Sequence, residues 1–506
     1  MLRKNLRSSL LPLSKPSATP TAIHRFFSSS SLRQNVLNEL ESRGMLQDLT
    51  SRAARQHVEK PTTVYLGVDP SANSLHLGNL LALIGLLHFR LQGHNAIALI
   101  GGATGSIGDP SGRSTERNAL SPETLEANVA GITRQLTTFL DRGVAFAQSR
   151  TRRRDNEATT TATGEGKETV EGTIRVENNM KWIGGMSLLD FLSKVGKMAR
   201  VSTMLSRESV KSRLDSSSGI SFTEFSYQLL QAYDFLTLHR LHNCTIQLGG
   251  SDQLGNIASG IDMIRRSKFG NDVEEEEGGK GGGDDPAFGV TFPLLTTASG
   301  EKFGKSAGNA VWLDPKMTSP FDVYQFFLRT TDEEVEKYLK IFTFIRVVEI
   351  KGIMEDHKAQ PSARIAQKVL AAEATELIHG SEGLQQALAA TKLFYTPSSS
   401  LASLIDESFL LALDGSSSTS TIPSILVRLP KSDILGDKLE KIAIESGLFG
   451  SKTQARKAIE AGTLQINGVK IKAKDHQRKI EEGDLLQGKL VVLKAGKSGN
   501  KAVLLE

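Results

Sequence analysis

The sequence has a single cysteine, Cys244, among its 506 residues. One thiol excludes an intramolecular disulfide and a thiolate metal cluster, and it fits a reducing compartment. The sequence also has no run of 18 apolar residues, so it predicts no transmembrane helix and no membrane partner. Acidic residues are missing as well from one stretch, the segment before Glu39.

That acid-free segment carries six basic residues, more than the whole chain's formal charge of +5. It is rich in serine, and its leucines can form an apolar side. These features are typical of a mitochondrial transit peptide, which we expect over residues 1–35 and which would direct the mature chain to the mitochondrial matrix. The alternative is a basic tail without a targeting role.

A chain of this length exceeds one hydrophobic core and predicts about two to four domains. Two charged, glycine- or threonine-rich stretches without periodicity, near residues 149–170 and 271–285, are interpreted as surface insertions. A serine-rich stretch that begins at Asp414 predicts a flexible linker over residues 414–430.

The most informative stretch is Tyr65–Leu80, which predicts a strand, a tight turn and a buried helix. Residues alternate from Val64 to Asp69, so Tyr65 and Asp69 share one face of the strand. The apolar run that follows places His76 at a helix N-terminus, where free backbone N–H groups attract phosphate. The alternative is an ordinary strand–helix unit with an incidental histidine.

A second strand, Ala96–Ile100, ends in a glycine-rich loop that carries Asp109, Arg113 and Arg117. Open α/β sheets bind ligands at the carboxyl ends of their strands. These three charged side chains are therefore candidates for ligand contacts.

Two further strands end in polar residues. The strand Thr245–Gly250 leads into Asp252 and Gln253, and the strand Val290–Leu295 leads into a loop with Lys302 and Lys305. Two lysines in one loop can neutralise a polyphosphate. A solvated basic turn is the alternative.

A helix is predicted from Phe222 to Phe235. Its spacing puts Tyr227, Gln231 and Asp234 on one face, where they can form the polar wall of a pocket. A solvated helix face is the alternative.

Helical periodicity dominates residues 318–413, which we interpret as a separate helical domain. Residues 431–506 then predict two short helices and, from Asn467-Gly468, a hairpin. Eight lysines and arginines against two acids between Ser451 and Lys479 form a cluster suited to a nucleic-acid backbone. A solvated face is again the alternative.

In this order the motifs resemble one family, the bacterial-type tyrosyl-tRNA synthetases of class I, in a mitochondrial version of the fungal kind. Tyr65–Asn79 is similar to the HIGH region and Lys302-Phe-Gly-Lys-Ser306 to the KMSKS loop. The resemblance implies an α/β fold with a Rossmann-like parallel-sheet catalytic domain (36–317), an α-helical anticodon-binding domain (318–413) and a small α+β S4-like RNA-binding domain (431–506).

The same resemblance implies the substrates L-tyrosine, ATP with its Mg²⁺, and the mitochondrial tRNA for tyrosine, and a homodimer. It implies no metal site on the protein. Tyr65 and Asp234 would bind the phenolic hydroxyl, and Gln253 and Asp69 would lie beside the carboxylate. The full tyrosine pocket would be Tyr65, Asp69, Asp109, Tyr227, Gln231, Asp234, Gln247 and Gln253, with Asp109, Tyr227 and Gln231 holding the ammonium group.

For ATP the implied residues are Gly67, Ser71, His76, Gly78, Asn79, Asp252, Lys302, Lys305, Arg113 and Arg117, with Asp252 beside the ribose. The catalytic set within and beside them is His76, Asn79, Lys302, Lys305 and Ser306. RNA contacts fall on Lys452, Arg456, Lys457, Lys470 and Lys472.

Two positions depart from the family pattern. Asn79 replaces the second histidine of HIGH and keeps a hydrogen-bond donor, and Gly304 replaces the central serine of KMSKS, which predicts a more mobile loop. Two other functions fit part of the sequence: an RNA-binding splicing factor for group I introns on the same scaffold, and a small nucleotidyltransferase. The second would need neither the lysine loop nor the basic C-terminal part.

Overall fold

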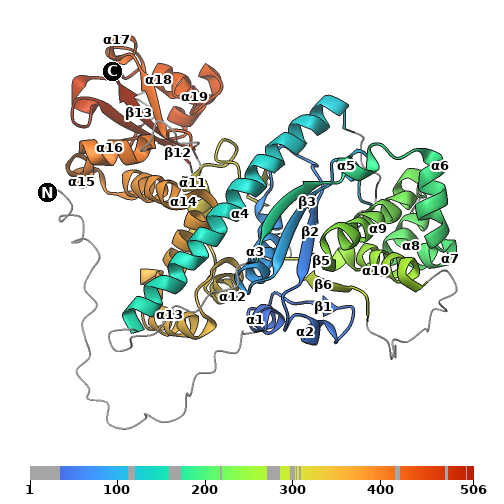
Figure 1. The fold of residues 1–506 in the computed structure, drawn as a ribbon. Helices are drawn as coiled ribbons and strands as arrows, with labels where there is room; N and C mark the ends of the chain where they lie inside the picture. The colour runs from blue at the N-terminus through green and yellow to red at the C-terminus, as the bar shows by residue number, and fades with distance from the viewer. Residues whose placement is uncertain are drawn as a thin grey trace, which may run out of the picture. The chain divides into compact units, whose positions relative to one another are not determined.

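The computed structural model describes residues 35–111, 115, 120–158, 172–216, 219–269, 285–296, 303, 305–306, 309–415, 422–472, 477–496 and 499–506 (Figure 1). Contacts gather Asn35–Glu506 into one compact unit. The transit peptide expected at the N-terminus and nearly all of the 271–285 insertion lie outside the described residues. No described helix combines the length and the hydropathy that crossing a membrane requires.

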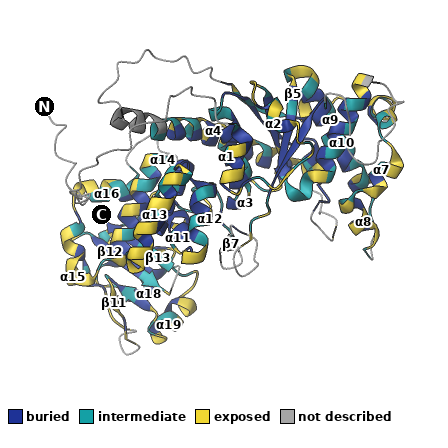
Figure 2. Ribbon diagram, turned by 90° about the horizontal axis from the view of Figure 1, so that it is seen from below, coloured by how far each residue is buried: buried dark blue, intermediate teal, exposed yellow. Residues whose placement is uncertain are grey.

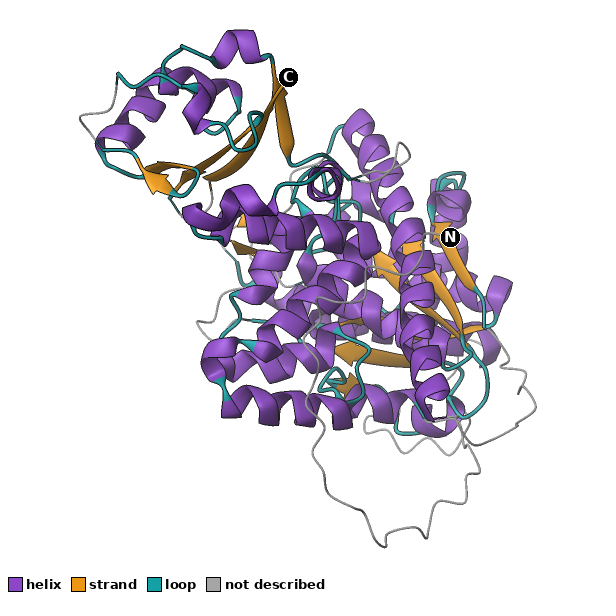
Figure 3. Cartoon of the chain, turned by 90° about the vertical axis from the view of Figure 1, so that its left-hand side faces the viewer, coloured by secondary structure: helices purple, strands orange, loops and turns teal. Residues whose placement is uncertain are grey.

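In the described part of the chain, a six-stranded sheet has the order β1-β6-β5-β2-β3-β4. All neighbouring strands are parallel except β1, which pairs antiparallel with β6. The strands lie between helices (Figure 3). They are β1 (Asp48–Leu49), β2 (Thr63–Val68), β3 (Asn95–Ile100), β4 (Ile174–Asn178), β5 (Cys244–Gly250) and β6 (Phe288–Phe292).

The alternation predicted for β2 is confirmed. Val64, Leu66 and Val68 belong to one buried cluster, and Tyr65 belongs to a second cluster on the other face. The first cluster packs against α3 (Leu77–Leu91) and α4 (Pro122–Ala158), and the second packs against α9 (Phe222–His242) and α10 (Leu254–Phe269). The four central strands β2, β3, β5 and β6 are largely buried on both faces, as expected of parallel strands, whereas the edge strands β1 and β4 are partly exposed (Figure 2).

The remaining helices of this region are short. They are α1 (Val36–Ser42), α2 (Ala54–His57), α5 (Met180–Ile183), α6 (Leu188–Asp190), α7 (Val201–Ser206) and α8 (Glu208–Leu214). Helix α1 ends at Ser42, and Asp48–Leu49 then pair with β6 as the edge strand β1. Two short strands, β7 (Lys305–Ser306) and β8 (Asn309–Ala310), form a separate antiparallel pair.

Helix α4 continues to Ala158, into the segment interpreted from the sequence as an insertion near residues 149–170. Arg150 explains part of this extension, because its guanidinium pairs with Glu373 at 3.0 Å and with Glu376 at 2.6 Å. Both acids lie on α14 (Ile365–Tyr395), so the extended helix rests on the helical region.

That helical region consists of α11 (Pro320–Leu328), α12 (Asp332–Phe342), α13 (Val347–Ala359), α14, α15 (Ser398–Leu401) and α16 (Glu407–Asp414). Its side chains, including Val323, Phe327 and Leu370, belong to the same buried cluster as α3 and β2. The helices therefore share a hydrophobic core with the sheet. The predicted boundary between a catalytic and an anticodon-binding domain near residue 318 stays a prediction.

The C-terminal part is a second sheet in the order β11-β10-β12-β13-β9, beside α17 (Lys431–Ile434), α18 (Leu439–Glu445) and α19 (Lys452–Glu460). Its strands are β9 (Leu426–Leu429), β10 (Leu464–Ile466), β11 (Val469–Lys470), β12 (Leu490–Ala495) and β13 (Gly499–Leu505). The predicted hairpin is confirmed between β10 and β11, with positive φ at Asn467 and Gly468. Strand β9 lies within the residues expected to be linker.

This C-terminal sheet is covered on both faces. Val491 and Leu493 pack with α18 and α19, whereas Leu490 and Val492 pack with α14 and α16. The alternation along β12 therefore places one face of the sheet against the helical region.

Candidate active site

A cavity of about 380 Å³ opens at the carboxyl ends of β2, β3 and β5, beside the N-terminus of α3. Parallel α/β sheets place their ligand sites at this edge. The cavity brings together fourteen residues expected from the sequence: Tyr65, Gly67, Asp69, Ser71, His76, Gly78, Asn79, Asp109, Tyr227, Gln231, Asp234, Gln247, Asp252 and Gln253.

The side chains of the lysines and arginines expected to contact ATP are not described by the structure. Arg113, Arg117, Lys302 and the departure at Gly304 lie outside the described residues. For Lys305 and Ser306 the structure describes the backbone, in β7.

At the deep end of the cavity lies the carboxylate of Asp234, which is 3% exposed. It accepts hydrogen bonds from Asn179 Nδ2 at 2.9 Å and from Trp182 Nε1 at 2.7 Å. Burial, helped by the charge of Asp69, raises the pKa of Asp234 to about 7 despite these two donors. The site therefore holds a carboxyl group that is costly to ionise until something offsets its desolvation.

Two more buried polar groups face the same end. Tyr65 and Gln247 are register partners on β2 and β5, so their side chains point to the same face. Within the described residues, neither the Tyr65 hydroxyl nor Gln247 Oε1 has a hydrogen-bond partner. Because unpaired buried polar groups cost free energy, these two atoms mark where a polar group of a ligand fits.

Nearer the strand ends, Asp69 accepts a hydrogen bond from the Tyr227 hydroxyl at 2.7 Å and another from Thr104 at 2.8 Å. The pKa of Tyr227 is raised by burial and then by the charges of Asp69 and Asp109. A Cβ on Gly101 would lie 2.0 Å from Asp69 Oδ1, so glycine is required where the loop passes this carboxylate. Two aspartates near one phenol favour a cationic group in this part of the cavity.

A network of amide side chains surrounds Asp109 in the same cavity. Gln253 Nε2 donates to Asp109 at 2.6 Å, and Gln231 Nε2 donates to Gln253 at 3.3 Å. Asn256 Nδ2 lies within 3.3 Å of acceptors on Asp109, Gln231 and Gln253. The network fixes the orientation of three side chains that were predicted to contact substrate.

The other end of the cavity is the start of α3. His76 is its N-cap, and Asn79 Oδ1 accepts a hydrogen bond from the His76 backbone N–H at 3.1 Å. This bond uses the amide oxygen of Asn79 and leaves its NH₂ group as the donor side. In the first turn the Leu77 N–H already donates to the Val311 carbonyl at 2.9 Å and the Asn79 N–H to the His76 carbonyl at 2.9 Å. What suits an anionic phosphate here is the positive end of the helix dipole.

Sequence reasoning missed Thr104, Asn179, Trp182 and Asn256. Asn179 follows the end of β4, so recognising that short strand would have marked it by the same strand-end rule. Trp182 lies in the one-turn helix α5, and no pattern in the sequence indicated its contact with Asp234.

A parallel sheet with a helix N-terminus suited to phosphate and a buried polar pocket is typical of α/β proteins that bind a nucleotide. The family model "tRNA synthetases class I (W and Y)" matches residues 56–396, and "Tyrosine--tRNA ligase SYY-like C-terminal domain" matches residues 421–502. The chain belongs to the class I tyrosine–tRNA ligase family.

Individual relatives agree with this assignment. The chain is 41% identical to a tyrosine–tRNA ligase of Opitutus terrae, over 91% of this chain and 97% of that protein. It is 40% identical to a chloroplastic/mitochondrial tyrosine–tRNA ligase of Arabidopsis thaliana, over 93% of this chain and 84% of the relative. A C-terminally truncated mitochondrial tyrosyl-tRNA synthetase of Aspergillus nidulans superimposes with a TM-score of 0.61 and 35% identity, covering 72% of this chain and 94% of the other.

Proposed function

We propose that this protein activates L-tyrosine with ATP and transfers the tyrosyl group to the 3′ terminal adenosine of the tRNA for tyrosine. The observation that carries the proposal is the pair of Tyr65 and Asp234 at the deep end of the cavity. A phenolic hydroxyl both donates and accepts, so it can donate to Asp234 and accept from the unpartnered Tyr65 hydroxyl. Phenylalanine would leave the Tyr65 hydroxyl unpaired and would leave Asp234 with only its two protein donors, Asn179 and Trp182.

The ammonium group of tyrosine lies, in this proposal, among Asp109, Tyr227 and Gln231. Asp69, which the family resemblance put beside the substrate carboxylate, is assigned here to the ammonium group instead. Its carboxylate accepts a hydrogen bond from Tyr227 and would repel the carboxylate of the substrate. The substrate carboxylate then points toward Gln253 and the α3 end of the cavity, where ATP is expected.

The first reaction is attack of a tyrosine carboxylate oxygen on the α-phosphorus of ATP. A new P–O bond forms, the bond to the β-phosphate breaks, and pyrophosphate leaves with its Mg²⁺. No enzyme nucleophile is needed, so the protein contributes orientation and donors for the developing charge. We assign these donors to His76, Asn79 and Ser71, together with Lys302, Lys305 and Ser306 of the lysine loop.

In the second reaction a hydroxyl of the terminal ribose of tRNA attacks the carbonyl carbon of the adenylate, and AMP leaves.

The remaining assigned residues bind ATP. Gly67 and Gly78 let ATP approach the backbone, and Asp252 binds the ribose of ATP. Arg113 and Arg117 supply further positive charge near the phosphates.

The C-terminal sheet and its helices serve in this proposal as the S4-like RNA-binding part, with the helical region contacting the anticodon arm. Lys452, Arg456, Lys457, Lys470 and Lys472 are exposed there, as a phosphate-binding surface requires. Arg456 also pairs with Glu440 at 3.1 Å, which fixes its position on α19.

We place the protein in the mitochondrial matrix. The support is the composition of residues 1–35 and the organellar names of the Arabidopsis and Aspergillus relatives. A fungal source is proposed on the basis of the Aspergillus relative. The relatives are named as ligases, which favours tRNA charging over the intron-splicing alternative.

We also propose a homodimer through residues of α6, α7 and the start of α9, three helices that Figure 1 labels. Leu188, Leu189 and Phe222 are 71%, 77% and 76% exposed there, and Val201 is 62% exposed. Each of these four large apolar side chains would be removed from water in an interface between subunits. A second copy is the proposed occupant because the family resemblance implies a dimer.

The test of the proposed activity is exchange of labelled pyrophosphate into ATP by the purified chain. Exchange should depend on tyrosine and should not occur with tryptophan. Exchange without any amino acid, or none with tyrosine, would contradict the proposal.

A further inference from the structure

Phe303 stands between Lys302 and Lys305 in the sequence of the loop, and its ring is buried. It is 5% exposed and lies against four aromatic rings of the helical region. Its ring centroid is 5.3 Å from that of Phe326 and 6.3 Å from that of Phe327, both on α11, and 4.9 Å from those of Tyr338 and Phe342 on α12. We call these four residues the aromatic box.

The backbone of Phe303 has a different set of neighbours. Its N–H donates to the carbonyl oxygen of Leu295, a residue of the cavity wall, at 3.0 Å. Its own carbonyl oxygen lies 3.8 Å from the place that a Cβ on Gly78 would occupy, in the first turn of α3. One residue thus joins α11 and α12 to the phosphate end of the cavity.

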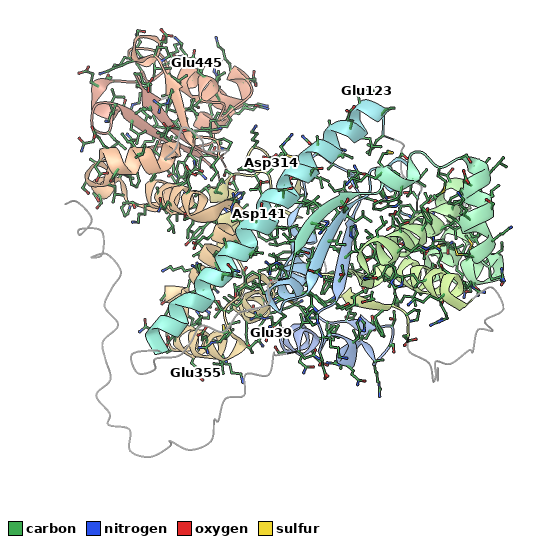
Figure 4. The ribbon with its side chains drawn as sticks, viewed as in Figure 1. Glu39, Glu123, Asp141, Asp314, Glu355 and Glu445 are labelled. Atoms are coloured by element: carbon green, nitrogen blue, oxygen red, sulfur yellow. The ribbon has the colours of Figure 1, made fainter. Side chains whose placement is uncertain are left out.

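The chain beyond the loop is held against the same end of α3. Leu77 N–H donates to the Val311 carbonyl at 2.9 Å, and Leu313 N–H donates to the Leu75 carbonyl at 2.8 Å. The next residue, Asp314, which Figure 4 labels, donates its N–H to Ser74 Oγ at 3.2 Å. These bonds fix where the chain leaves the loop, and Phe303 is the buried anchor on the other side.

Because the chain is continuous, fixing the position of Phe303 also limits where the backbone of the two lysines can lie. Lys302 is bonded to Phe303, so their Cα atoms are about 3.8 Å apart, and the Cα of Lys305 is within about 7 Å. We propose that Phe303 is a positioning residue for the pyrophosphate-binding lysines, acting through the aromatic box. This inference rests on the proposed function and adds to it a residue that contacts neither tyrosine nor ATP.

The chemistry explains why such an anchor matters. Lysine is a flexible point charge, and it stabilises the leaving pyrophosphate only if its backbone is held within reach. A misplacement of about 1 Å can reduce a rate by about 100-fold. Removing the ring should therefore change ATP-dependent steps and leave the tyrosine pocket unaffected, because Tyr65, Gln247 and Asp234 lie on β2, β5 and α9.

The experiment compares Phe303→Leu with wild type in the full-length chain, by steady-state pyrophosphate exchange normalised to active sites. We expect kcat/KM for ATP to fall by about 10- to 100-fold, with KM for tyrosine within about twofold of wild type. Phe303→Tyr keeps the ring and should recover most of the activity, even if burial of its hydroxyl lowers thermal stability.

The matched control is Phe394→Leu. Phe394 is 7% exposed and lies 5.3 Å from the ring of Phe321, in a cluster that does not include the loop. It should lose a comparable amount of stability and keep its kinetics. If Phe303→Leu does not fold, Phe342→Leu, which removes the ring stacked on Phe303, should show a smaller loss in the same ATP parameter.

The outcomes separate the two proposals. No tyrosine-dependent exchange by wild type would refute the proposed function. Exchange by wild type with unchanged ATP kinetics in Phe303→Leu, or an equal loss in Phe394→Leu, would refute the positioning role alone. An equal rise in KM for tyrosine would also refute it, because the effect would then be a general loss of structure.

Discussion

Replacing Asp234 by asparagine removes a charge that is costly to bury in the cavity. Burial raises the pKa of this carboxyl group from its usual 3.8 to about 7. One pKa unit between the folded and unfolded chain is worth about 1.4 kcal/mol, so ionised Asp234 destabilises the empty enzyme by about 4 kcal/mol above pH 7. The function of the pocket is thus built on a group that opposes folding.

The sign of the pH dependence follows from proton binding. Between about pH 4 and pH 7 the folded chain holds a proton on Asp234 that the unfolded chain has lost, so stability falls as the pH rises through this window. From pH 5 to pH 8 the loss should be about 2–3 kcal/mol. Asp234→Asn should lack it, because an amide does not titrate.

The assay is urea unfolding without tyrosine at pH 5, 6, 7 and 8, followed by tryptophan fluorescence. Both tryptophans, Trp182 and Trp312, lie in the catalytic region, and Trp182 donates directly to Asp234. The amide must face either Trp182 or Asn179 with an NH₂ group, which costs about 1–3 kcal/mol at every pH. The diagnostic quantity is therefore the change with pH in the difference between the two proteins.

The control is Asp141→Asn, which alters an exposed aspartate on α4 (Figure 4). It should show the same pH dependence as wild type. A difference between wild type and Asp234→Asn that stays constant from pH 5 to pH 8 would refute the reasoning, since Asp234 would then be ionised throughout.

Three other perturbations test separate parts of the account. Tyr65→Phe should lower kcat/KM for tyrosine by about 5- to 10-fold and leave KM for ATP unchanged, as for one neutral hydrogen bond; equal losses for both substrates would contradict the pocket assignment. The double variant Lys457→Glu, Lys470→Glu should weaken tRNA charging, most strongly at low salt, and spare pyrophosphate exchange; unchanged charging would remove the RNA role from this surface. Leu189→Glu should shift the protein from dimer to monomer in analytical ultracentrifugation, and an unchanged mass would place any dimer contact elsewhere.

Much of the cavity could be predicted because strand alternation and strand ends are visible in sequence. Tyr65 and Asp69 follow from the period of β2, and Tyr227, Gln231 and Asp234 follow from the period of α9. Such regularities are local, so a single chain segment reveals them.

What the sequence did not reveal depends on contacts between distant segments. Trp182 contacts Asp234 across 52 positions, and Phe303 finds its partners on two helices of another region. The burial of one face of the C-terminal sheet against α14 and α16 is of the same kind. It also means that truncation at Asp414 would expose apolar surface, so charge reversal is the better test of RNA binding.

The central claim is that the deep end of the cavity selects a phenolic hydroxyl. The most direct measurement is the ratio of kcat/KM for tyrosine to that for phenylalanine in pyrophosphate exchange by the full-length chain. A tyrosyl-tRNA synthetase is itself the established example of such discrimination, at about 10⁵-fold, and we expect a ratio of that order here. A ratio below about 100 would be the selectivity of a plain apolar pocket and would contradict the roles of Tyr65 and Asp234.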